Sequence, residues 1–127
     1  MRIAAALLAC LALAAPAAAA PRELAGTWRG TWTNPAVGTA GGVRLVGGGA
    51  LLLRLSGPAL GCAGPTVLPL GYGHGVLSGV GHHVPCNEGL RWSFRGRVAH
   101  GGIAGTLTLR LADGTRATVA VTLHRRR

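Results

Sequence analysis

The chain contains no lysine and very few acidic residues. All 13 basic side chains are arginine, whereas Asp and Glu together number 3 and the formal net charge is +10. General acid–base catalysis and glycoside hydrolysis need cooperating carboxylates at one site, and three scattered acids do not supply such a pair. The composition therefore argues against an enzyme, and we expect no catalytic residues.

Aromatic residues are also scarce: the chain has three Trp, one Tyr and one Phe. Outer-membrane barrels present apolar residues to lipid and carry aromatic girdles. Here the large apolar residues share a face with the tryptophans, and Arg and Thr occupy the opposite face. The pattern therefore argues against an outer-membrane barrel. Without exposed aromatic residues between the arginines, it also argues against a nucleic-acid partner.

The one long apolar run is confined to the first twenty residues. A positive start at Arg2 is followed by the apolar residues 3–15, a break at Pro16 and the small residues 17–20. This order is typical of a cleaved secretory signal peptide. A membrane anchor fits less well, because alanine dominates the run and is only weakly apolar.

We therefore expect residues 1–19 to be a signal peptide and residues 20–127 to form a single β domain. The expected location is the periplasm or the extracellular space of a bacterium, with no transmembrane segment in the mature chain. The Leu7–Cys10 stretch resembles a lipoprotein box but lies too close to the N-terminus.

Two cysteines, Cys62 and Cys86, remain after such cleavage. In an exported protein an even pair predicts one disulfide, which would contribute about 3 kcal/mol in the chain-entropy model. Both lie in the Gly- and Pro-rich segment 57–89, which we expect to form a disulfide-tied excursion over one barrel end. Residues 67–70 and 76–80 within it each suit a short strand, with Pro69 restricted to an edge or bulge. The segment serves either as stapled edge strands or as the rim of a pocket.

Three histidines in the same segment, with Cys86, are of the types that bind zinc or copper: His74, His82 and His83. Their spacing matches no standard zinc finger, and adjacent residues on a strand point to opposite faces. A disulfide would also remove Cys86 as a ligand. We therefore expect solvated histidines, with no metal and no cofactor.

Strict alternation of apolar and polar residues predicts half-buried β-strands along the chain. Trp28 and Trp32 alternate with Arg29 and Thr31, for example. Six segments carry this pattern: 24–33, 43–45, 51–55, 90–98, 103–111 and 117–123. Several strands with one apolar face each must curl or stack to bury it. The predicted fold is all-β, a small antiparallel meander barrel or sandwich of about 6–8 strands.

Short connections support antiparallel neighbours. Asp113-Gly114 lies between two alternating runs and predicts a hairpin with a type I′ turn, because both residues tolerate a positive φ. The glycine-rich stretches 100–102 and 47–49 suit the same role less specifically.

The start of the first strand, Gly26-Thr27-Trp28, resembles the Gly-x-Trp strand of the lipocalin and avidin group of ligand-binding barrels. In that group the Trp closes one barrel end, and a basic residue near the last strand packs across it. Arg125 or Arg126 is placed for that role here. The resemblance implies an apolar ligand inside the barrel.

Four aromatic residues share the inward faces of the first strand and a late strand: Trp28, Trp32, Trp92 and Phe94. They are the candidates for ligand contact, although inward aromatic residues also serve as plain core. The first functional hypothesis is an exported, non-catalytic domain that binds a small apolar ligand or a protein partner at one barrel end.

The alternative hypothesis uses the outward arginines as a basic surface for anionic envelope components, such as lipopolysaccharide, anionic lipid or another polyanion. A solvated face that only keeps the domain soluble would show the same composition. The arginines concerned are Arg29, Arg44, Arg54, Arg91, Arg95, Arg110, Arg116 and the tail 125–127.

Overall fold

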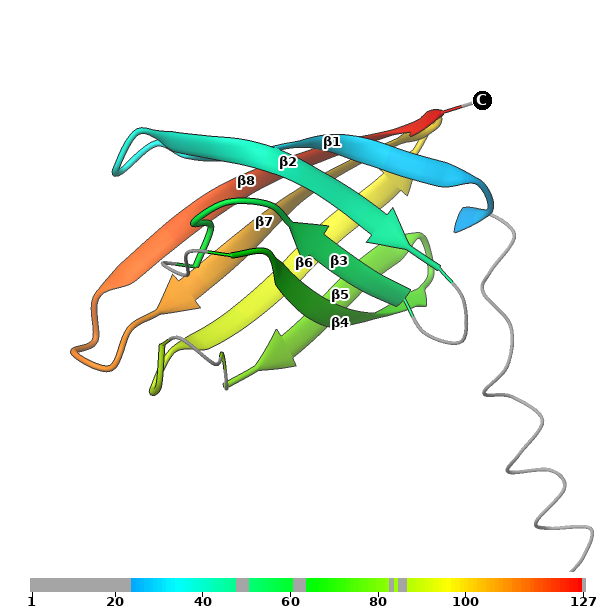
Figure 1. Cartoon of the computed structure of the whole chain (residues 1–127). Helices are drawn as coiled ribbons and strands as arrows, with labels where there is room; N and C mark the ends of the chain where they lie inside the picture. Colours follow the sequence, from blue (N-terminus) through cyan, green and yellow to red (C-terminus); the bar gives the residue numbers. More distant parts are fainter. Residues whose placement is uncertain (1–23, 48–50, 61–63, 83, 85–86, 127) are drawn as a thin grey trace, which may run out of the picture.

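Eight antiparallel strands form a closed barrel in the computed structural model of the chain (Figure 1). The structure describes residues 24–47, 51–60, 64–82, 84 and 87–126. Each strand pairs with the next, and β8 pairs with β1. The predicted meander is therefore confirmed, as a barrel and not as a sandwich. The strands are β1 (Thr27–Asn34), β2 (Thr39–Val46), β3 (Leu51–Leu55), β4 (Thr66–Gly73), β5 (Val76–Gly81), β6 (Arg91–Ala99), β7 (Gly102–Arg110) and β8 (Arg116–Arg126).

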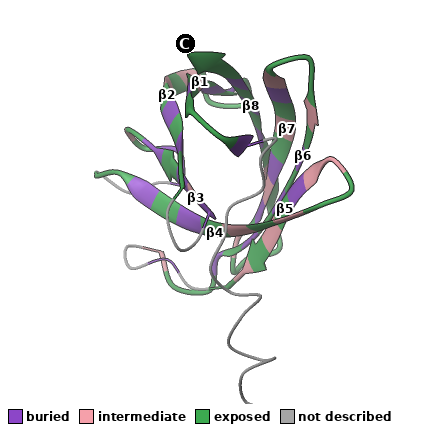
Figure 2. Cartoon of the chain, turned by 90° about the vertical axis from the view of Figure 1, so that its right-hand side faces the viewer, coloured by how far each residue is buried: buried purple, intermediate pink, exposed green. Residues whose placement is uncertain are grey.

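The alternation in sequence becomes an inside and an outside of this barrel. Along β6, Trp92 and Phe94 are buried while Arg91 and Arg95 are exposed. The other strands repeat the alternation, which is visible as bands of burial in Figure 2. Eight strands enclose an interior just wide enough to be filled by side chains or to hold one small ligand. No described residue belongs to a helix that is long and apolar enough to cross a membrane.

The segment 57–89, for which an excursion over one barrel end is predicted, contains two strands. Its two apolar runs form β4 and β5, and both are full members of the closed barrel. Pro69 pairs with Leu52 on β3, whereas the pairing of β4 with β5 covers only 71–73 and 76–78. Pro69 thus lies beyond the ladder between β4 and β5. Cys62 and Cys86 lie outside the described residues, so their disulfide stays a prediction.

The Asp113-Gly114 hairpin forms, but its turn is not type I′. Only Gly114 has a positive φ, of 89°, whereas a type I′ turn needs two such residues. The Leu111 N–H donates to the Thr115 carbonyl, and Asp113 Oδ1 accepts from the Thr115 N–H at 2.9 Å. A three-residue loop with glycine in the left-handed region accounts for this geometry.

The two-residue turns with two positive φ values begin with histidine. They are His74-Gly75, between β4 and β5, and His100-Gly101, between β6 and β7. The glycine-rich stretch 100–102 therefore contains a two-residue turn of the kind that the sequence predicts most strongly at Asp113-Gly114.

The connections divide between two barrel ends. The Trp28 end, defined by the start of β1, also holds the end of β8 and the turns at 74–75 and 100–101 (Figure 1). The loop end holds the connections 35–38 and 111–115, together with the described residues between β3 and β4 and between β5 and β6.

Candidate functional site

Trp28 is buried near the start of β1, with an arginine packed across its ring. Its side chain is only 1% exposed, and its Nε1 donates a hydrogen bond to the Leu24 carbonyl at 3.2 Å. β1 pairs with β8 so that Trp28 lies opposite Arg125, and the Arg125 Cζ lies 4.8 Å from the centre of the Trp28 ring. Arg125, and not Arg126, is therefore the basic residue that packs across this tryptophan.

The other three aromatic candidates are also buried. Trp32, Trp92 and Phe94 are all at most 5% exposed, and the Trp32 Nε1 donates to the Ser56 carbonyl at 2.7 Å. Their rings lie directly against glycine backbones. A Cβ on Gly41 would lie 2.5 Å from Trp32 Nε1, and one on Gly105 would lie 2.5 Å from Phe94 Cζ. These contacts hold the rings against the barrel wall.

Side chains of the chain itself occupy the interior around these rings. Seven side chains from β1, β3, β5, β7 and β8 have no exposed surface: Trp32, Leu53, Leu55, Leu77, Leu107, Val119 and Leu123. A side chain without accessible surface has no space for a water-sized molecule beside it. The four aromatic candidates thus lie within the packed core, and their contact with a ligand stays a prediction.

The outer surface carries arginines that face one another across strands. On adjacent strands Arg29 lies opposite Arg44, and Arg44 lies opposite Arg54. His124 on β8 continues this line beside Arg29. We call Arg29, Arg44 and Arg54 the first arginine row. Directly opposed residues have Cβ atoms about 5 Å apart, so these three guanidinium groups belong to one local patch.

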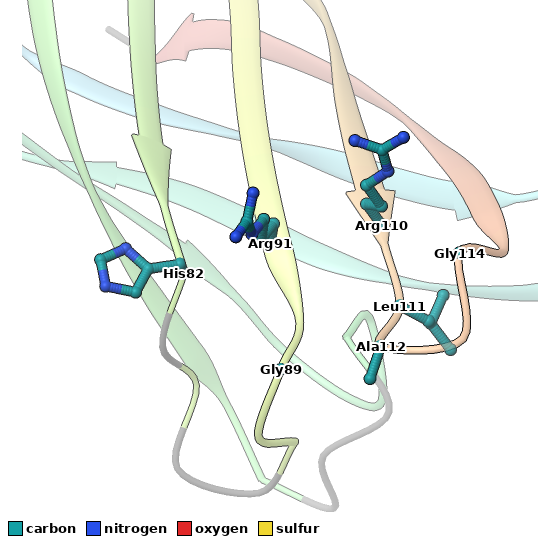
Figure 3. A pocket seen from close by; sticks show the side chains of 7 residues that line it. All are labelled: His82, Gly89, Arg91, Arg110, Leu111, Ala112 and Gly114. Atoms are coloured by element: carbon teal, nitrogen blue, oxygen red, sulfur yellow. The ribbon is translucent and has the colours of Figure 1, made fainter.

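A second arginine row crosses the strands β6, β7 and β8. Arg91 on β6 lies opposite Arg110 on β7, and Arg110 lies opposite Arg116 on β8. A hollow of about 550 Å³ adjoins this row at the loop end, lined by Arg91, Arg110, His82 and the 111–114 turn. Figure 3 shows the two guanidinium groups on neighbouring strands, with His82 at the end of β5.

No carboxylate within the described residues neutralises these rows. Neither row forms an ion pair there, and the acids in that part of the chain are Glu88 and Asp113. Asp113 is used by its own turn, where hydrogen bonds from Thr115 lower its pKa below the ordinary value. The rows therefore present positive charge to solvent, an arrangement that attracts anions.

The histidines considered as metal ligands do not come together where they are described. His74 lies in the turn before β5 and His82 follows β5, so the length of that strand separates them. No group of three potential ligands forms among the described residues, and His83 and Cys86 lie outside them.

Sequence reasoning identified the outward arginines but not their rows. Alternation assigns a residue to a face, whereas a row depends on the register between strands. The comparisons with known proteins give no further assignment, because no family model, curated protein or solved structure matches this chain.

Proposed function

We propose that this protein is a non-catalytic binding protein whose outer arginine rows bind an anionic polymer or an anionic surface. One observation carries this proposal: in each row three arginines lie directly opposite one another without a carboxylate partner in the described part of the chain. Like charges directly opposed across strands destabilise a sheet. A bound polyanion would offset that repulsion.

The same proposal assigns the barrel interior a structural role. The Trp28–Arg125 stack supports the resemblance to the lipocalin and avidin group, in which an equivalent contact closes the barrel. That group's ligand lies inside, but here packed side chains surround Trp32. We therefore propose a calycin-type scaffold whose binding surface is outside. If the protein is exported, as its first residues predict, this surface faces the anionic components of the cell envelope.

Heparin binding as a function of salt tests the proposed function. We expect the protein to bind immobilised heparin at low ionic strength, with a Kd that rises at least about tenfold between about 50 and 300 mM NaCl, because exposed charges are screened by salt. Native mass spectrometry of the same sample should show the protein without a bound small molecule. Failure to bind heparin at low salt, or a co-purified apolar molecule in stoichiometric amount, would contradict the proposal.

A further inference from the structure

The outer face of β6 carries a column of exposed arginines along the strand. Arg91, Arg95 and Arg97 all point outward, at alternating positions of one strand. At about 3.4 Å per residue the column spans about 20 Å from its first to its last member. This β6 column runs along a single strand, whereas each arginine row runs across three neighbouring strands.

Three hollows follow one another beside this column. The first is the loop-end hollow at Arg91. The second, of about 460 Å³, is lined by Arg95 together with Ser78, Ser93, Thr106 and Thr108. The third, of about 260 Å³, adjoins Arg97 and is lined by Ala104, Thr122 and His124 among others.

The strand register explains why the surface is hollowed there. On β7, Thr106 lies opposite Arg95 and Ala104 lies opposite Arg97. On β8, Ala120 lies opposite Thr106 and Thr122 lies opposite Ala104. Small side chains on β7 and β8 thus form a low floor beside the taller arginines of β6. The three hollows lie in series along β6, each lined by one arginine of the column, and we call the strip that contains them the β6 groove.

The chemistry of this groove distinguishes between classes of polyanion. Arginine at intervals, with Ser and Thr hydroxyls between, matches a chain in which acidic groups alternate with hydroxyl groups. Single-stranded nucleic acid would require exposed rings for stacking, but the Trp and Phe side chains are buried and Tyr72 is half-buried. A flat bilayer surface would contact the rim of a groove and not its floor.

We propose that the β6 groove binds one extended chain of an acidic polysaccharide, with Arg91, Arg95 and Arg97 pairing with its anionic groups. This inference rests on the proposed function and adds its ligand class and its binding path. Arg44 and Arg54 of the first arginine row line none of the three hollows, whereas Arg29 lies opposite His124, which lines the third hollow.

Two triple variants of equal charge test the path. One carries Arg91→Gln, Arg95→Gln and Arg97→Gln, and the matched control carries Arg29→Gln, Arg44→Gln and Arg54→Gln. Isothermal titration with a heparin octasaccharide at fixed salt should give a Kd at least about tenfold weaker for the β6 variant. The variant of the first arginine row should lose less affinity than the β6 variant, because that row adds general attraction and only Arg29, opposite His124, borders the groove.

Filling the groove tests the same path without changing charge. Ala104→Phe places a ring in the third hollow, and Thr106→Phe places one in the second. Both should weaken octasaccharide binding, whereas Val67→Phe on the outer face of β4, which lines none of the three hollows, should not. Circular dichroism establishes whether each variant is folded. If only one of Ala104→Phe and Thr106→Phe folds, that variant alone tests the groove.

The outcomes separate the groove from the general proposal. Equal losses in the two triple variants, with no effect of the ring substitutions, would overturn the groove and leave polyanion binding by net charge. A single-stranded oligonucleotide that binds the β6 groove more tightly than the octasaccharide would overturn the assigned ligand class. Absence of octasaccharide binding by the unaltered protein at low salt would overturn both proposals.

Discussion

Trp32 and Gly41 show how single residues determine the packing of this barrel. The indole of Trp32 lies over the backbone of Gly41 and donates to the Ser56 carbonyl beside it. Any side chain at Gly41 would enter the space of the ring. The sequence marks Trp32 as inward, but it gives no sign that Gly41 on the next strand makes room for the ring.

Gly41→Ala should destabilise the protein by about 1 to 3 kcal/mol, because the new methyl group overlaps the Trp32 ring and the Ser56 carbonyl. The matched control is Gly42→Ala, since a Cβ at Gly42 would lie 4.0 Å from its nearest neighbour, Ser56 Oγ. We expect that control to change the free energy of unfolding by no more than about 0.5 kcal/mol. Urea denaturation measures the free energy of unfolding of both variants. Equal losses in Gly41→Ala and Gly42→Ala would show that the close approach of Trp32 to Gly41 does not require glycine there.

The Trp28–Arg125 stack gives a second prediction at this scale. Arg125→Ala should cost about 0.5 to 1 kcal/mol and shift the tryptophan fluorescence, because it removes the cation over the ring. Trp28→Ala should cost about 3 to 5 kcal/mol as a large buried truncation. Arg126→Ala is the control, since Arg126 lies opposite Thr27 and not opposite Trp28. If Arg126→Ala shifted the fluorescence as much as Arg125→Ala, the assigned stack would be wrong.

At the scale of the elements, the alternation of apolar and polar residues predicts which side chains point into the barrel. It does not predict the register between neighbouring strands. Residues such as Leu107 and Leu109 are buried as their pattern predicts. Pairing between strands depends on turn geometry, and the Asp113-Gly114 turn has one more loop residue than the predicted type I′ turn. The opposed arginines therefore could not be recognised from the sequence, although each was assigned to the outer face.

Arg44→Glu tests the repulsion within the first arginine row. A carboxylate between Arg29 and Arg54 replaces two repulsive pairs by two attractive ones, so the variant should be about 0.5 to 1 kcal/mol more stable. Arg44→Gln removes the repulsion alone and should be intermediate. Urea denaturation at low salt gives the order. A Glu variant less stable than the Gln variant would contradict the account of the row.

The hairpin between β7 and β8 gives a pH-dependent prediction. Hydrogen bonds from Thr115 lower the pKa of Asp113, so the ionised carboxylate stabilises the fold above its ordinary pKa. That contribution is lost as the pH falls through the lowered pKa, below about pH 4. Asp113→Asn keeps an acceptor oxygen but does not titrate. The stability difference between the two proteins should therefore shrink in acid, and a difference that is constant down to pH 2 would contradict the assigned hydrogen bonds.

At the scale of the whole molecule, we propose that the binding surface lies on the outside of a barrel whose core is packed. The sequence predicts an all-β barrel or sandwich and is compatible with two binding sites, one inside the barrel and one on its outer face. Which of them is favoured depends on how tightly the interior is filled and on which arginines face one another. Both follow from three-dimensional packing and strand register, which the alternation of residues does not specify.

The most direct test follows the indole and guanidinium signals in one NMR titration with the heparin octasaccharide. The three indole N–H groups report on the interior, because Trp28, Trp32 and Trp92 are buried there. The arginine Nε–H groups report on the outer surface. The account predicts that signals of Arg91, Arg95 and Arg97 shift progressively while the indole signals of Trp32 and Trp92 stay in place. Shifts confined to those indole signals, with the arginine signals unchanged, would contradict it and place the binding site inside the barrel.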